Sequence, residues 1–179
     1  MARLDPIPVE KLTPEQQKVH AVLAGTRKRV TGPFAIWLRI PNVAYTANEF
    51  THALREKGLL EKRQFELLVM IVTRHWSARY AWAQHEPLAV AAGLSPDVIE
   101  AIRTKRKPAF SKPDEQLLYD MATELINTME LSAPTYDRML KEFGIERAIE
   151  AISVTGFYGM VSTVLKGFDV PTLSGENPF

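Results

Sequence analysis

Hydrophobic residues recur along most of the chain at the three- and four-residue spacing of amphipathic helices. The clearest case lies within residues 113–129, where four apolar side chains follow one another at intervals of four: Leu117, Met121, Leu125 and Met129. No pair of segments has the alternation and turn residues of a β-hairpin. The pattern predicts an all-α protein, a helical bundle of about seven to eight helices.

Capping residues, prolines and glycines divide this pattern into separate helices. Thr13 and Gln16 can form a capping box around Pro14, and Gly25 and Gly144 are expected to end the helices that precede them. The expected helices span residues 14–24, 41–57, 61–76, 77–92, 95–104, 113–129, 132–143 and 145–166. A short basic turn is expected at 26–29, followed at 32–39 by a turn and a short apolar segment.

The chain of 179 residues is expected to form one domain, since this length suits a single domain with a sizeable core. Residues 1–12 contain two prolines and are expected to form an extended arm, and residues 167–179 an irregular tail. Gly156 and Gly159 lie inside the last expected helix, at a spacing that would let another backbone come close.

Composition restricts the function classes. Lys and Arg number 22 against 21 Asp and Glu, and a net charge of +1 argues against broad binding to nucleic acid or to an anionic membrane. No apolar run reaches the roughly 20 residues that cross a bilayer, and no secretory signal is recognised at the start, so a cytoplasmic protein is expected. The sequence has no cysteine, which excludes disulfides, thiolate metal sites and cysteine nucleophiles.

The histidines do not have the spacing of a metal site. His20, His52, His75 and His85 form neither a His-x₃-His pair nor a His-Glu-x-x-His string. A glycine-rich phosphate loop and a Gly-x-Ser-x-Gly motif are also missing from the sequence. We therefore expect no bound metal and no phosphate-binding loop.

Glu66 lies within an apolar run, residues 65–72, which we interpret as a helix because the flanking sequence continues in helix-compatible residues. A carboxylate in such surroundings must be paired or become neutral. It would pair with Arg74 or Lys62, lie at an exposed helix edge, or orient and polarise His85, as carboxylates do beside general acid–base histidines.

His85 shares its helix face with small and apolar residues, so it is either a core histidine bonded to a carbonyl or a histidine beside a pocket. Pro87 disturbs this turn of the helix, because it lacks an N–H and leaves the carbonyl of Ala83 without its helical partner. A freed carbonyl is an acceptor for a ring N–H or a ligand.

Glu66 is followed nineteen residues later by His85, within the string YAWAQHEPLA at 80–89 and a GLS helix start at 93–95. This stretch of about 30 residues resembles the core of the carboxymuconolactone decarboxylase and alkylhydroperoxidase D-like family. The peroxidase branch of that family has cysteines where this chain has Ala78 and Ala81. Alanine supplies neither a nucleophilic nor a resolving thiol, so thiol peroxidase activity is excluded chemically.

The resemblance is closer to the decarboxylase branch, which works without those thiols. It implies a cofactor-free site for a small, acidic, cyclic substrate and a homo-oligomer, either a trimer or a hexamer. We therefore expect a decarboxylase-type lyase for a small carboxylated or lactone-like metabolite, with Glu66 and His85 as a proton relay. Tyr80, Ser77 or a backbone N–H would stabilise the developing oxyanion, although Tyr80 lies about 140° from His85 around an ideal helix.

Further residues are expected to bind the substrate, whose carboxylate would suit an arginine. The candidates are Arg39, Arg74, Arg79, His75, Ser77 and Trp82. For the cations, the alternative is an ordinary solvated surface charge. The aromatic residues Phe157, Tyr158 and Phe168 would either close the pocket or pack in the core.

Three other functions stay open at this point. The same relay would serve an isomerase or tautomerase, since both reactions need one proton carrier and one oxyanion donor. The chain would otherwise be a non-catalytic oligomer that binds a small molecule, or a thiol-free protein that acts with a peroxidase partner.

Overall fold

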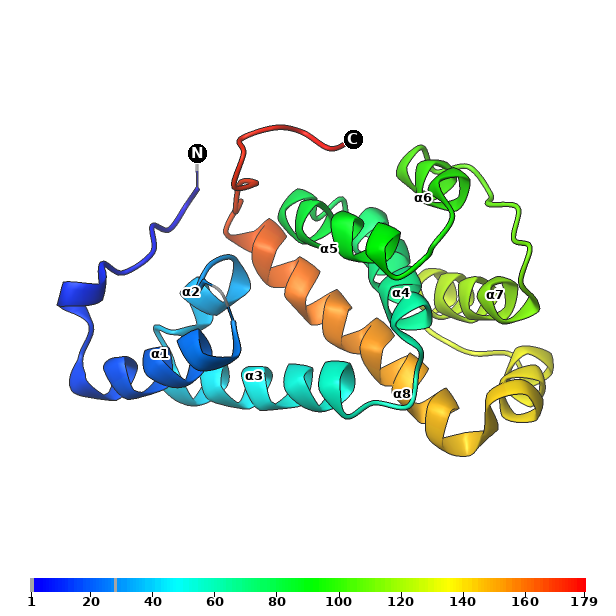
Figure 1. Ribbon diagram of the computed structural model, residues 1–179, viewed down its shortest axis with the longest axis horizontal. Helices are drawn as coiled ribbons and strands as arrows, with labels where there is room; N and C mark the ends of the chain where they lie inside the picture. The colour runs from blue at the N-terminus through cyan, green and yellow to red at the C-terminus, as the bar shows by residue number, and fades with distance from the viewer. Residues whose placement is uncertain (1, 28) are drawn as a thin grey trace.

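A computed structural model shows the arrangement of the chain and describes residues 2–27 and 29–179 (Figure 1). Within these ranges it has eight α-helices, one short 3₁₀ helix and no strand, which confirms the all-α prediction. The helices are η1 Val9–Lys11, α1 Pro14–Thr26, α2 Pro33–Trp37, α3 Pro41–Glu56, α4 Lys62–His75, α5 Arg79–Ala91, α6 Pro96–Arg103, α7 Pro113–Thr128 and α8 Ala133–Gly167.

Of the capping signals around α1, the predicted start is confirmed and the predicted stop is not. The predicted capping box forms at the start of α1, where the Gln16 N–H donates to Oγ1 of Thr13 at 3.3 Å and the Thr13 N–H donates to Oε1 of Gln16 at 3.0 Å. The predicted stop at Gly25 is wrong, because α1 runs on to Thr26 and ends where the Arg27 N–H bonds the carbonyl of Leu23.

Two further predictions differ from the structure. Residues 33–37, expected only as an apolar segment, form the short helix α2. The two helices expected at 132–143 and 145–166 are joined in α8, which bends at Gly144. Gly144 has φ 71° and ψ 170°, a conformation that favours glycine, so its position as a break in the helix is correct.

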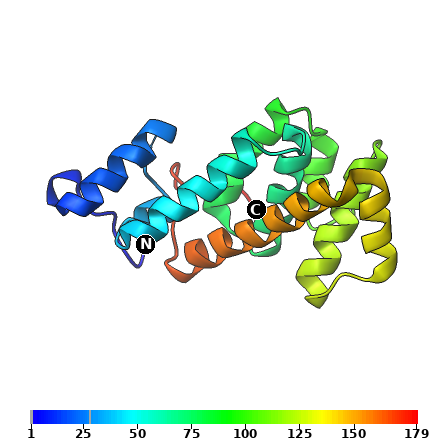
Figure 2. The ribbon, with the colours of Figure 1, turned by 90° about the horizontal axis from the view of Figure 1, so that it is seen from below.

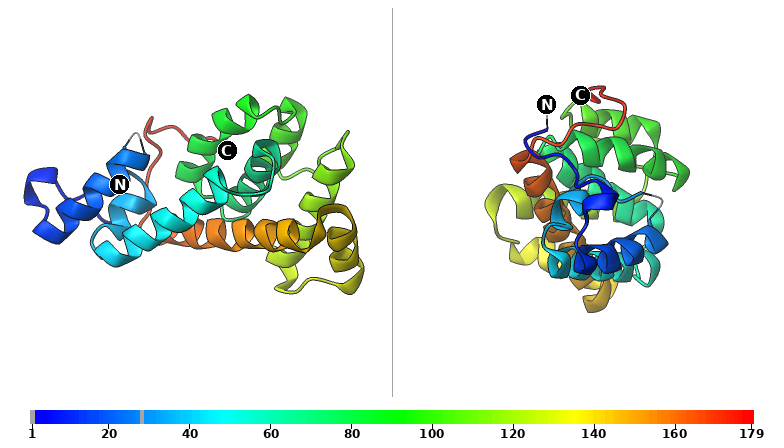
Figure 3. Two further views of the ribbon diagram at one scale, coloured as in Figure 1. Left: turned by 60° about the horizontal axis from the view of Figure 1, so that its bottom comes forward. Right: turned by 90° about the vertical axis from the view of Figure 1, so that its left-hand side faces the viewer.

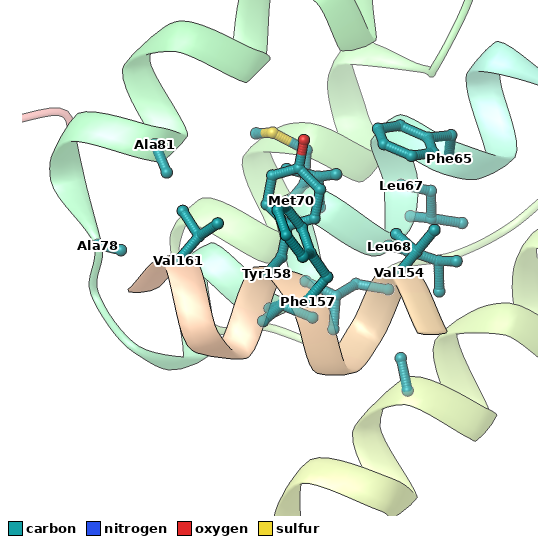
Figure 4. Packing of buried hydrophobic residues seen from close by; sticks show 14 of the residues in the cluster. Phe65, Leu67, Leu68, Met70, Ala78, Ala81, Val154, Phe157, Tyr158 and Val161 are labelled. Atoms are coloured by element: carbon teal, nitrogen blue, oxygen red, sulfur yellow. The ribbon is translucent and has the colours of Figure 1, made fainter. Parts of the chain in front are cut away.

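α4 is the central helix of the protein and packs against α5, α7 and α8. Its residues 63–73 are all buried, the polar Arg63, Gln64, Glu66 and Thr73 among them. This explains why the apolar residues at 67–72 are not confined to one stripe of the helix. Figure 4 shows side chains of α4, including Phe65, Leu67 and Met70, interleaved with Val154 and Tyr158 of α8. The apolar run is therefore a buried helix, as predicted.

Helices α1–α3 form one end of the molecule, and α6, α7 and the start of α8 form the other (Figures 1 and 2). The N-terminal arm lies beside the C-terminal end of α8 (Figure 3), where the Arg3 N–H donates to the carbonyl of Phe168 at 3.0 Å. The arm contains the η1 turn, and the tail after Gly167 contains no helix.

α8 is the one helix of the described residues that is long and apolar enough to cross a membrane, judged by length and composition alone. Of its most apolar 18-residue window, 56% is buried inside the protein, and a core helix meets the same criterion. The close backbone approach expected at Gly156 and Gly159 is not made within this part of the chain, since no heavy atom lies within 4 Å of a Cβ built at either residue.

Candidate active site

Glu66 and His85 are in direct contact inside the protein. Oε2 of Glu66 lies 2.7 Å from Nδ1 of His85, and the two residues are only 5% and 8% exposed. The short connection between α4 and α5 makes this contact, because it turns the chain back so that the two helices pack antiparallel. Ser77 in that connection has a left-handed φ of 49°, and the Ala78 N–H closes the turn on the carbonyl of Thr73 at 2.8 Å.

The imidazole of His85 is contacted on its other side by Tyr158 of α8. The Tyr158 hydroxyl lies 3.3 Å from Nε2, and the two rings meet edge to face with centroids 5.1 Å apart. Figure 4 shows Tyr158 pointing from α8 towards the layer formed by α4 and α5. Burial raises the pKa of Tyr158 well above its usual value, so this hydroxyl stays protonated.

These contacts assign the protons of the neutral imidazole. A carboxylate only accepts hydrogen bonds, so the bond to Glu66 requires a proton on Nδ1. Nε2 is then an acceptor, and the Tyr158 hydroxyl donates to it. Glu66, His85 and Tyr158 therefore form a buried chain of hydrogen bonds drawn from three different helices, a fixed arrangement suited to moving a proton.

The second oxygen of Glu66 faces a cation. Oε1 lies 3.7 Å from Nη2 of Arg55, whose guanidinium also lies over the ring of Phe65 at 5.7 Å from its centroid. The ion pairs considered with Arg74 and Lys62 are not formed. Glu66 is thus shared between His85 and Arg55, and neither of its oxygens lacks a polar neighbour.

A pocket of about 220 Å³ lies beside His85 and Tyr158. Phe34 and Phe157 form apolar parts of its wall, and Tyr80 and three arginines form polar parts. A second hollow of about 290 Å³ reaches Glu66. His85 lines the first hollow and Glu66 the second, and Arg55 and Leu88 line both.

Tyr80 lines the same pocket as His85, on a different part of its wall. Its hydroxyl donates to Oγ1 of Thr31 at 2.7 Å, and burial raises its pKa, an effect that the bond to Thr31 opposes. Gly32 makes room for this ring: it has φ 60°, and a Cβ there would clash with the Tyr80 side chain. Tyr80 and His85 are about 140° apart around α5, yet both line one pocket. This is possible because the loop before α2, which Tyr80 contacts through Thr31, forms part of the pocket wall.

The structure places the six other predicted site residues outside this pocket, among them Arg79, which is exposed at the start of α5. Three of them, Arg74, His75 and Ser77, lie at the connection between α4 and α5, more than two helical turns from Glu66. Arg74 donates to the carbonyl of Arg103 at 2.6 Å and to Oγ of Ser77 at 3.0 Å, and His75 is exposed beside Trp76.

Arg39 and Trp82 also have other partners. Arg39 is exposed and donates to the carbonyl of Asp5 in the N-terminal arm at 2.8 Å. Trp82 is fully buried and donates from Nε1 to Glu86 at 2.9 Å, while its ring meets that of Phe179 edge to face. The guanidinium of Arg74 lies 4.2 Å from the Phe179 centroid. Trp82 and Arg74 therefore hold the C-terminal tail.

The cations that do line the pocket are Arg27, Arg29 and Arg55. Arg27 and Arg29 follow α1, and Arg55 lies near the end of α3, so all three are distant in sequence from the motif around His85. The basic turn expected at 26–29 is the one sequence feature that points to two of them. For Tyr158 the sequence predicts only a role in closing the pocket or packing in the core, and the structure adds its bond to His85.

No group of three metal-ligating side chains lies together in the described part of the chain. No protein-family model matches the sequence, and neither does any curated protein.

Solved structures match the fold. An uncharacterized peroxidase-related protein from Silicibacter sp. TM1040 has a TM-score of 0.75 and 16% identity, over 94% of this chain and 90% of that one. Another, an alkylhydroperoxidase AhpD core protein from Ralstonia eutropha JMP134, has a TM-score of 0.78 and 17% identity, over 96% of this chain and 92% of that one. The chain therefore has the all-α, alkylhydroperoxidase D-like fold.

Proposed function

We propose that this protein is a cofactor-independent lyase of the decarboxylase type, which acts on a small carboxylated or lactone-like metabolite. The observation that supports this most is the buried chain Glu66–His85–Tyr158, which meets a pocket lined by arginines. A histidine held by a carboxylate is a common general acid–base, and the pocket leaves room for a guest beside it.

The proposed reaction needs no metal or organic cofactor, because the substrate accepts its own electrons. The bond to a carboxylate γ to a conjugated carbonyl breaks, CO₂ leaves, and the electron pair moves through the double bond onto the carbonyl oxygen. Protonated His85 then delivers a proton to carbon from Nε2, and Glu66 holds the ring through Nδ1. The Tyr80 and Tyr158 hydroxyls, kept protonated by burial, are the donors available to the oxyanion.

Thiol chemistry is not part of this proposal. The matched structures are called peroxidase-related, but this sequence contains no cysteine, and the residues that replace the family's thiols, Ala78 and Ala81, are buried and carry no reactive group. The second candidate function is an isomerase or tautomerase, favoured by the same relay, since removing and returning a proton next to a carbonyl uses the same groups.

The experiment is an incubation of the purified protein in D₂O with a panel of lactone acids and keto acids, read by CO₂ release and by mass spectrometry. The proposal expects CO₂ release with deuterium at the product carbon. Deuterium uptake without CO₂ would replace the lyase by the isomerase. No CO₂ and no deuterium across the panel would contradict both and favour a binding protein.

We also propose that the protein forms a homo-oligomer, a trimer or a hexamer. Support comes from α8, where Ile145, Ile149 and Met160 are 52%, 57% and 44% exposed and Gly156 has open space around it. Such apolar exposure on a long helix is typical of a contact with a further chain. Light scattering after size exclusion is expected to give three or six times the 20.2 kDa chain mass, and a monomer at micromolar concentration would contradict the proposal.

A further inference from the structure

The pocket beside His85 has an unbalanced charge. Three guanidinium groups line it, those of Arg27, Arg29 and Arg55, and no carboxylate of the described residues does. Glu66, the carboxylate bonded to His85, lies behind the ring and faces Arg55 alone among these arginines, at 3.7 Å. The carboxylate of Glu49 is outside the lining and lies 3.4 Å from Nδ2 of Asn48. With His85 neutral, the site therefore has an excess of positive charge.

Arg27 is the most firmly held of the three. Its guanidinium carbon lies 3.4 Å from the centroid of the Phe34 ring, and Nε donates to Oδ1 of Asn48 at 2.9 Å. Asn48 is 1% exposed and therefore a rigid acceptor. Stacking and one hydrogen bond fix the plane of the guanidinium, and of its five N–H donors only the one on Nε is used within the described residues.

This cation has no acidic partner within 4 Å in the part of the chain that the structure describes. Burial lowers the pKa of Arg27 to about 10, and the charge of Arg55 acts in the same direction. The side chain is still a cation at neutral pH. A desolvated cation without a counter-ion costs free energy, and such groups are typical of sites that receive an anion.

We propose that Arg27 is the carboxylate-binding residue of this pocket and that the ligand is a small, flat carboxylic acid. The free edge of the guanidinium would hold both carboxylate oxygens in the two-pronged geometry that arginine favours. Arg29 and Arg55 supply the surrounding positive charge, and the rings of Phe34 and Phe157 form apolar walls for the body of the acid. This inference rests on the proposed function for its active site but is tested by binding alone.

The test compares 4-fluorobenzoate with its neutral analogue 4-fluorobenzamide by ¹⁹F NMR, at low chloride so that surface charges are not already screened. The wild-type protein is expected to bind the acid about 10- to 100-fold more tightly than the amide, the range for hydrogen bonds to a charged group. Arg27→Gln is expected to abolish this preference, and Arg27→Lys to keep part of it, because lysine retains the charge without the fork.

Arg39→Gln is the matched control, since it removes an exposed arginine outside the pocket, and it is expected to keep the wild-type preference. Thermal unfolding of each variant checks the fold; because Arg27→Gln removes the stacking on Phe34 and the hydrogen bond to Asn48, binding is measured well below the unfolding transition of every variant. A wild-type preference in Arg27→Gln, or an equal loss in Arg39→Gln, would overturn the proposal.

Different results would contradict the lyase function and the carboxylate-binding role of Arg27. His85→Gln is expected to lose turnover and keep the preference for 4-fluorobenzoate, since His85 is not the proposed anion-binding residue. Acid binding that depends on Arg27, without turnover of any panel member, would leave the subsite standing and remove the lyase. Turnover with an unchanged KM in Arg27→Gln would remove the subsite and leave the lyase.

Discussion

Replacing His85 by glutamine is expected to lower turnover by about 10²–10⁴ while the protein stays folded. The glutamine amide can still donate to Glu66 and accept from Tyr158, so the buried hydrogen bonds have a partner, but an amide does not carry protons at neutral pH. The measurement is the initial rate of CO₂ release, or of deuterium uptake, on the panel member with the fastest wild-type turnover.

His75→Gln is the matched control for this substitution. His75 is exposed at the end of α4, beside Trp76, and lies outside the pocket. It is expected to turn over at the wild-type rate. A folded His85→Gln protein with the same rate as His75→Gln would show that the imidazole is not the proton carrier.

Replacing Glu66 by glutamine is expected to lower turnover by about 10²–10³. The amide oxygen can accept the Nδ1 proton of His85, so the ring keeps its place, but a neutral amide no longer stabilises the positive charge that the imidazole gains in each cycle. The change also leaves Arg55 without its nearby carboxylate. The measurement is kcat under saturating substrate, combined with denaturant unfolding to confirm the fold.

Glu86→Gln is the control, because Glu86 is next to His85 in sequence yet bonds Trp82 and Arg103. It is expected to lower the free energy of unfolding and leave kcat near the wild-type value. The double variant of Glu66 and His85 is expected to be no slower than His85→Gln alone, since two groups of one relay are not additive. Additive losses would mean that Glu66 acts independently of the histidine.

Much of the fold follows from local patterns in the sequence. The helical spacing of apolar residues and capping signals such as Thr13 place most helix ends within one or two residues. The wrong helix predictions also have local causes. Gly25 is accommodated inside α1, because a glycine at the end of a helix stops it only if it adopts a non-helical conformation. Residues 33–37 are too few to show a helical period.

The sequence predicts only part of the site. Glu66 and His85 lie on either side of one short turn, so a hairpin of two helices brings them together, and the motif already points to that pair. The other walls come from far along the chain: Tyr158 is 73 residues from His85, and Arg27 and Arg55 belong to the α1–α3 end. No periodicity within one helix predicts which of these distant elements packs against it.

Choosing arginines by closeness to the motif fails for the same reason. Arg74 lies within the motif stretch, between Glu66 and His85 in sequence, but it lies near the end of α4 and binds the carbonyl of Arg103. Arg55 reaches Glu66 because the end of α3 lies beside this part of α4, as the pocket shared by Arg55, Phe65 and Glu66 indicates. Tertiary packing, not sequence distance, determines the electrostatics of this site.

The most direct test of the relay is long-range ¹H–¹⁵N NMR of the histidine side chains, recorded across a pH series and compared with the Glu66→Gln protein. We expect that His85, whenever its ring is neutral, carries its proton on Nδ1 and presents Nε2 as an acceptor, and that its Nδ1 signal moves when Glu66 is replaced. A neutral His85 protonated on Nε2, or a spectrum that the Glu66 substitution leaves unchanged, would contradict the proposed proton relay.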